Sequence, residues 1–150
     1  MSGESALGFL VVVILAAILL ASVVNFVYDN PPAPSGSRVV LNVGLALWKT
    51  PEHYEFIESI NWSSLKPNEI KSVVGYLENI GDINLTLSLD VYDWRPEIAG
   101  NYISIVANST AYILKPSEEI AVKFSIFISP SVKGFVDFSN MISLNGSYET

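Results

Sequence analysis

The sequence predicts a mainly β protein, with one N-terminal helix of the transmembrane type followed by an antiparallel immunoglobulin-like β-sandwich of about seven to eight strands. Three observations predict this fold class. An uncharged apolar run extends from Ala6 to Tyr28, a proline-rich segment follows it, and beyond Arg38 apolar and polar residues alternate. Alternation with a period of two is typical of half-buried strands. We therefore divide the chain into residues 1–28, 29–37 and 38–150.

The first segment is long enough to cross a bilayer. A helix over Ala6–Tyr28 is about 35 Å long, against a hydrocarbon core of about 30 Å. We expect a retained anchor rather than a cleaved signal peptide or a processed pilin helix, because Glu4 and no basic residue precedes the run. Small and polar residues spaced four apart form one stripe, which favours helix packing. These helix-packing candidates are Ala17, Ala21 and Asn25.

The second segment, "DNPPAPSGS" from Asp29 to Ser37, predicts a linker. Its prolines favour extended polyproline geometry, and Ser-Gly-Ser adds conformational freedom. We expect a stalk that holds the third segment away from the membrane surface.

The third segment predicts strands throughout. The strongest alternation covers Val39–Leu47, Leu85–Val91 and Ile120–Ile128. Weaker candidates are Tyr54–Ile60, Ile70–Asn79, Tyr102–Ala107, Thr110–Leu114 and Gly134–Leu144. The junction Glu78–Asn84 predicts a hairpin with positive φ at Gly81 or Asp82.

Two similar stretches, "LKPNEI" at Leu65–Ile70 and "LKPSEEI" at Leu114–Ile120, lie about fifty residues apart. In each, proline fixes φ, polar residues reverse the chain, and isoleucine starts the next strand. We interpret the pair as one turn used twice, rather than as a repeated binding motif.

The charge pattern and the sequons favour an exported domain. The net charge is −7, and the eight Lys and Arg residues are scattered, which gives nucleic-acid binding no basic surface. Triplets of the N-x-[ST] type are glycan acceptors on exported domains. The glycosylation candidates are Asn61, Asn84, Asn108 and Asn145. We expect a single-pass membrane protein whose C-terminal domain is extracellular.

No motif of an enzyme or cofactor site occurs in the sequence. The only histidine, His53, lies in a polar stretch and is expected to be a solvated loop residue; cysteine is absent, which excludes a cupredoxin copper site. Two sets of acidic residues, one around Trp94 and one after Pro51, are interpreted as solvated surface residues. Their members are Asp90, Asp93 and Glu97, and Glu52, Glu55 and Glu58. We expect no enzyme activity, no cofactor or metal, and no small-molecule substrate.

The stretch Ile60–Ser129 resembles small exported β-sandwich proteins of archaea, which are similar in build to the TasA/camelysin-like group. A Trp, an "LxPGE"-like turn, an "xNxG" strand end, an "LxL" strand and a "WxP" follow in order, and Asn68 stands where glycine is usual. The matching positions are Trp62, Leu65, Pro67, Glu69, Asn79, Gly81, Leu85, Leu87, Leu89, Trp94 and Pro96. Some members are filament or bundling-pilus subunits, so the resemblance implies a surface or filament role.

The N-terminal segment is similar to archaeal type IV pilins and archaellum stator proteins, which join an apolar helix to an immunoglobulin-like domain. Ser2 precedes Gly3, where pilins carry a basic residue.

These observations predict a membrane-anchored or assembled cell-surface structural or interaction protein that contacts the membrane and itself or other surface proteins. One alternative is a pilin-like filament subunit, joined by helix packing or by donation of a strand to a neighbour. The donor-strand candidates are Val39, Leu41, Val43, Leu45 and Leu47. A second alternative is an accessory subunit of a membrane complex.

Overall fold

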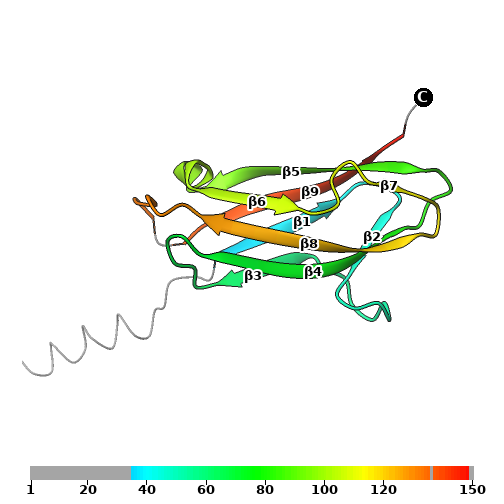
Figure 1. Ribbon diagram of the computed structural model, residues 1–150, viewed down its shortest axis with the longest axis horizontal. Helices are drawn as coiled ribbons and strands as arrows, with labels where there is room; N and C mark the ends of the chain where they lie inside the picture. Colours follow the sequence, from blue (N-terminus) through cyan, green and yellow to red (C-terminus); the bar gives the residue numbers. More distant parts are fainter. Residues whose placement is uncertain (1–34, 136, 149–150) are drawn as a thin grey trace, which may run out of the picture. The chain divides into compact units, whose positions relative to one another are not determined.

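The computed structural model describes residues 35–135 and 137–148, which belong to one unit of the chain, Pro34–Thr150. This unit is mainly β and consists of two sheets that face each other across an apolar core (Figure 1). One sheet has the strand order β3-β1-β9-β5-β7, and the other has the order β2-β4-β8-β6.

The elements of the described residues follow one another in chain order. They are β1 (Ser35–Leu41), β2 (Leu45–Trp48), β3 (Ser59–Ser63), β4 (Ile70–Asn79), β5 (Leu85–Arg95), the 3-10 helix η1 (Glu97–Asn101), β6 (Ile103–Ala107), β7 (Ile113–Leu114), β8 (Glu119–Ile128) and β9 (Ser139–Ser147).

The predicted anchor Ala6–Tyr28, with Ala17, Ala21 and Asn25, lies outside the described residues. Within 35–135 and 137–148, no helix has both the length and the apolar character needed to cross a membrane.

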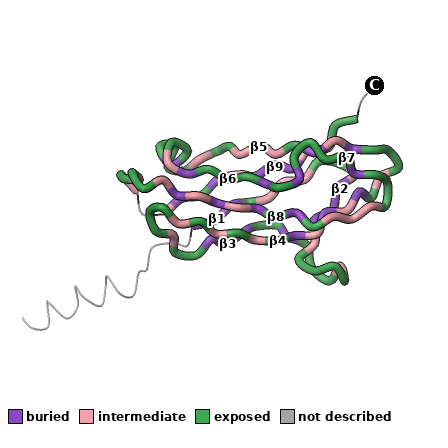
Figure 2. The backbone as a smooth tube through the Cα atoms, viewed as in Figure 1, coloured by how far each residue is buried: buried purple, intermediate pink, exposed green. Residues whose placement is uncertain are grey.

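Alternation correctly predicted the strands that form the centre of the core. In β8, Val122, Phe124 and Ile126 are fully buried, and the residues between them point away from the core. Leu77 of the neighbouring strand β4 is also fully buried. Figure 2 shows the buried positions recurring along the strands between the two layers. This packing removes large apolar side chains from water, which is the main stabilising contribution to such a fold.

The predicted single strand Val39–Leu47 is wrong, because it is two strands in different sheets. β1 ends at Leu41, the chain turns through Asn42–Gly44, and β2 starts at Leu45 in the opposite sheet. Gly44 has φ 92°, a left-handed conformation that glycine adopts readily. Val43, one of the apolar residues of the predicted strand, is 94% exposed at this turn. Alternation alone cannot reveal that the chain passes from one sheet to the other here, because apolar residues keep the same period of two before and after the turn.

Two further expectations about strand connection are corrected. The sheets are not wholly antiparallel, because β1 runs parallel to β9. The Glu78–Asn84 junction is not a hairpin, since β4 and β5 belong to different sheets, and neither Gly81 nor Asp82 has positive φ. Both errors have one cause: a sequence pattern specifies which faces are apolar, whereas pairing between strands depends on the whole chain.

The predicted linker ends earlier than expected, because β1 begins at Ser35 rather than at Arg38. Ser35 and Ser37 are buried, and the indole nitrogen of Trp62 donates a hydrogen bond of 2.8 Å to the Ser37 hydroxyl oxygen. A small hydroxyl residue at position 37 therefore leaves room for the buried Trp62 ring and satisfies its only donor. Ser-Gly-Ser serves packing here rather than flexibility.

The two proline-containing turns do share one backbone geometry, as predicted. Asn68 and Ser117 both have φ 62°, and the backbone N–H of Glu69 and Glu118 donates to the carbonyl of Lys66 and Lys115 respectively. Proline second and a positive φ third are features of a type II turn. Each glutamate side chain also accepts the backbone N–H of the lysine that begins its turn.

Candidate functional site

The strand that joins the N-terminal segment to the sandwich, β1, lies inside a sheet rather than at its edge. It pairs with β3 on one side, antiparallel, and with β9 on the other, parallel (Figure 1). The backbone N–H of Val39 donates to Glu58 at 2.9 Å, and that of Asn42 donates to Leu144 at 3.1 Å. Both edges of β1 are thus engaged.

The donor-strand candidates are divided by the turn after β1. Val39 and Leu41 lie on β1 and pack against the core; Leu45 and Leu47 are buried on β2 in the other sheet, and Val43 is exposed between them. Only β1 could therefore leave its sheet as a unit, with Asn42–Gly44 as the connecting segment.

Three of the four sequon asparagines are exposed. Asn61 lies on β3, Asn84 precedes β5, and Asn108 follows β6, so they are carried by different elements. The side-chain oxygen of Asn61 accepts the Ser63 N–H, and that of Asn108 accepts the Lys123 N–H. In both, the amide nitrogen, the atom to which a glycan is joined, is not used in these bonds.

The fourth sequon asparagine, Asn145, differs because it is half-buried within β9. Its amide nitrogen donates a hydrogen bond of 2.9 Å to the Asp90 carboxylate on β5, and its oxygen accepts the Ser143 hydroxyl. Modification of Asn145 would require this bond to Asp90 to break.

Exposed apolar side chains gather at the end of the sandwich where β1 finishes. Val43, Ile80 and Ile83 are exposed, and we call these three residues the apolar tip. The turns that carry them touch, because the Ile80 N–H donates to the Gly44 carbonyl at 2.9 Å. Exposed apolar residues that lie together are typical of contact surfaces.

Buried Asn79 fixes the turn that carries Ile80 and Ile83. Its amide nitrogen donates to the carbonyls of Ile83 and Leu114 at 2.7 and 3.0 Å, and its oxygen accepts the Gly81 N–H at 3.0 Å. Its own carbonyl accepts the Ser117 N–H at 2.9 Å. The satisfied side chain of Asn79 therefore connects β4 with the turn after it and with β7, and its main-chain carbonyl adds the Lys115–Glu118 turn.

His53 is not the solvated loop residue that the sequence suggested. Its side chain is 34% exposed, its ring stacks on Trp48 at 4.6 Å, and its nitrogens face Glu78 and Glu119. Sequence reasoning missed this cluster because the two glutamates lie far away in the sequence. The register of β4 against β8 brings them opposite each other.

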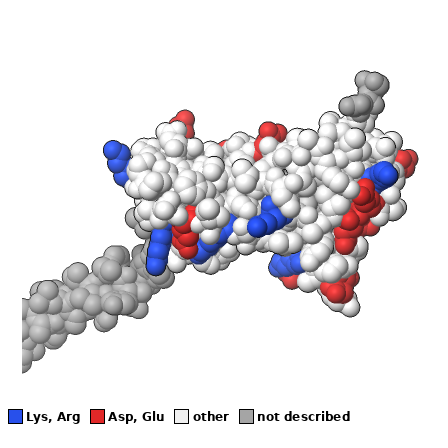
Figure 3. Space-filling view, in the orientation of Figure 1, with Lys and Arg blue, Asp and Glu red and all other residues white. Residues whose placement is uncertain are grey.

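Neither of the two sets of acidic residues noted in the sequence comes together as a binding site. Asp90 accepts Asn145, and Asp93 pairs with Arg95 at 3.3 Å. Glu55 pairs with Lys49 within its own loop. On the face shown in Figure 3, basic and acidic side chains are interspersed, with acidic groups most evident toward one end.

A scan against protein-family models found no match, and a search of curated proteins found no significant match.

Proposed function

We propose that the chain is a structural or interaction protein of the cell surface. The N-terminal apolar segment anchors it in the membrane, and an immunoglobulin-like β-sandwich faces outward. The resemblance of Ile60–Ser129 to exported archaeal β-sandwich proteins and the exposed positions of Asn61, Asn84 and Asn108 support this proposal.

The strand order supports the immunoglobulin-like part. In that fold, one sheet holds strands A, B, E and D, and the other holds C, F and G. Here β2, β4, β8 and β6 take the places of A, B, E and D, whereas β5 and β9 take those of C and F. The place of G, beside F, is filled by β1 from the opposite end of the chain, and β1 departs from the antiparallel sheets of that fold because it runs parallel to β9.

The observation that carries the proposal is the position of β1. The strand that directly follows the proline-rich segment is hydrogen-bonded to a neighbour on each side. A force applied through the N-terminal segment would therefore act on two rows of backbone hydrogen bonds at once, which suits a domain displayed on a tether.

Fractionation of cells that express the full chain tests this function. We expect the chain in the membrane fraction, resistant to carbonate extraction, and the sandwich accessible to protease added outside intact cells. A soluble chain in the cytoplasm, protected from external protease, would contradict the proposal.

A filament subunit is the second candidate, and the same strand favours it. A strand in the G place that belongs to the N-terminal side can be donated to a neighbouring copy, with Asn42–Gly44 opening as the hinge. In the recipient sheet, the donated strand would pair with the same β3 and β9 edges.

Cysteine pairs separate the two arrangements, because the chain contains no native cysteine. Arg38 and Met141 are register partners across β1 and β9. In the double variant Arg38→Cys/Met141→Cys, a closed monomer gives an internal disulfide. Strand donation instead gives covalent oligomers on a non-reducing gel. Each single variant is the control.

A further inference from the structure

We propose that His53, Glu78 and Glu119 form a binding site for a divalent transition-metal ion of the zinc type. This inference does not rest on the proposed surface role, because it concerns side chains of the sandwich alone.

Two carboxylates of the same charge are placed directly opposite each other on neighbouring strands. Glu78 is the next-to-last residue of β4 and Glu119 begins β8, and the two residues are register partners. Like charges at such positions destabilise a sheet. The side chains of both are about three-quarters buried, which limits screening by water. A cation between them would remove this repulsion.

The third ligand comes from a separate element. The loop between β2 and β3 carries His53, whose Nδ1 lies 3.7 Å from the Glu78 carboxylate and whose Nε2 contacts that of Glu119. One nitrogen of the ring and one oxygen of each glutamate lie within 4.8 Å of one another. Ligand atoms on two tetrahedral zinc bonds of about 2.1 Å lie roughly 3.4 Å apart. On binding, the outermost pair would therefore move closer together, and the His53 Nε2 and Glu119 carboxylate would move apart to admit the ion.

Trp48 holds two of the three ligands in position. Its ring stacks on the His53 ring with an interplanar angle of 9°, and its indole nitrogen donates to the Glu78 carboxylate at 3.2 Å. Phe56 stacks on Trp48 at 4.0 Å and supports it. Partners that orient the ligand side chains are a regular part of protein metal sites.

The donor set selects the class of ion. One imidazole and two carboxylates suit zinc and similar divalent metals, whereas calcium prefers six to eight oxygen ligands. The three side chains remain 24–34% exposed, so an ion has an entry path and a fourth position is open to water. The competing arrangement is a protonated imidazole lying between the two carboxylates, with no metal.

Zinc titration of the full chain tests the site. The protein is purified in detergent without a histidine tag, stripped with a chelator, and titrated with Zn²⁺ by calorimetry. We expect one equivalent to bind, and we expect His53→Gln and Glu119→Gln each to weaken binding at least tenfold. The matched control is Glu55→Gln in the same loop, which should bind as the native chain does. Absence of binding, or binding that His53→Gln leaves unchanged, would overturn the proposal.

A spectroscopic measurement guards against variants that fail to fold. His53 is the only histidine, so its imidazole signals in a nitrogen-15 NMR spectrum report this one site. In the unmutated chain, Zn²⁺ should shift one ring nitrogen and fix a single tautomer. A ring whose signals show two protonated nitrogens and do not respond to Zn²⁺ would establish the imidazolium pair instead.

Discussion

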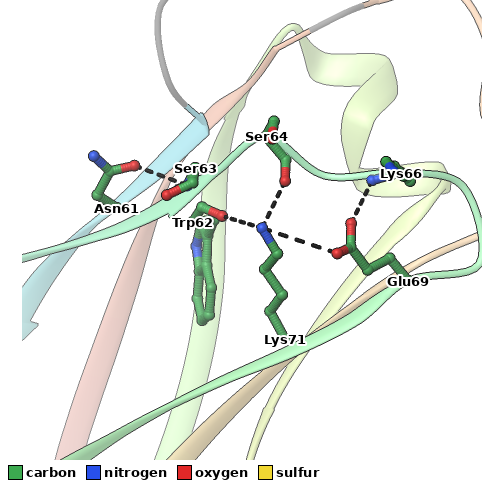
Figure 4. Close-up of polar contacts among 7 residues, drawn as sticks. All are labelled: Asn61, Trp62, Ser63, Ser64, Lys66, Glu69 and Lys71. Carbon is green, nitrogen blue, oxygen red and sulfur yellow. Dashed lines mark hydrogen bonds and ion pairs between the residues drawn. The ribbon is translucent and has the colours of Figure 1, made fainter.

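The turns Lys66–Glu69 and Lys115–Glu118 have the same backbone but different surroundings. In the first, Lys71 donates to the carbonyls of Trp62 and Ser64 at 3.2 and 2.6 Å and lies 3.9 Å from the Glu69 carboxylate (Figure 4). This turn is thus tied to the end of β3 by a half-exposed lysine.

The second turn, Lys115–Glu118, is held by hydrogen bonds to a buried residue. Ser117 donates its N–H to the carbonyl of buried Asn79, whose side chain also bonds to Leu114 just before the turn. Its Glu118 carboxylate accepts the Tyr112 hydroxyl in addition to the Lys115 N–H. Lys-Pro-x-Glu thus specifies the same turn in both places, and we expect the resistance of each turn to unfolding to depend on the different residues that hold it.

Replacement of the buried anchor should have the largest effect. Asn79→Ala leaves the Gly81 N–H and two carbonyls without their partner inside the protein, and each loss of this kind costs about 1–3 kcal/mol. We expect a total loss of about 3 kcal/mol in the free energy of unfolding, measured by urea denaturation with tryptophan fluorescence. A loss below that of the next variant would contradict the ranking of the two turns.

The exposed anchor of the first turn should matter less. Lys71→Met keeps the apolar stem and removes three polar contacts, which water can partly replace because the group is near the surface. We expect a loss of about 1 kcal/mol. The same denaturation series measures it, and Lys123→Met, on a neighbouring strand, serves as the control for removing a lysine charge.

Glycine at the third position of the turn, where φ is positive, should stabilise the Lys115–Glu118 turn more than the Lys66–Glu69 turn. A positive φ disfavours residues with a Cβ atom, and asparagine tolerates it better than serine. Ser117→Gly should therefore raise the free energy of unfolding by about 0.5 kcal/mol, and Asn68→Gly by less, after the added flexibility of the unfolded chain is counted. Equal changes at the two sites would show that the side chains make no difference.

The smallest effect concerns pH. The hydrogen bond from Tyr112, together with the Lys115 N–H, lowers the pKa of Glu118 below its ordinary value, and the same bond raises the pKa of Tyr112. The contribution of Glu118 to stability is present above its unfolded-state pKa and is lost as pH falls through the lowered one. Tyr112→Phe should move the pKa of Glu118 back up. Carbon-13 NMR titration of the carboxylate checks this, and an unchanged pKa would remove Tyr112 as its cause.

The sequence predicted local features of the fold well. Alternation located β4, β5 and β8, and the repeated Lys-Pro-x-Glu predicted one shared turn. Each of these depends on residues close together in the chain. The split of Val39–Leu47 between two sheets and the parallel pairing of β1 with β9 depend on partners far away, so periodicity could not predict them.

The candidate sites show the same contrast between features that depend on nearby residues and features that depend on distant ones. Exposure of Asn61, Asn84 and Asn108 could be expected from their polar triplets, but the bond from Asn145 to Asp90 joins two strands. Likewise His53 lies beside Glu78 and Glu119 only because β4 and β8 pair in one register. The sequence did hold one signal for this cluster, because Glu78 and Glu119 both lie near the ends of alternating segments.

The parallel pairing of β1 and β9 places the start of β1 and the end of β9 at opposite ends of the sandwich. Both strands run the same way, so β1 enters at one end and β9 leaves at the opposite end. The nine residues of β9 cover roughly 25–30 Å at about 3.3 Å per residue. A reporter fused after Ser147 would consequently report from the pole remote from the incoming chain, and copies joined end to end would form an extended array rather than a compact cluster.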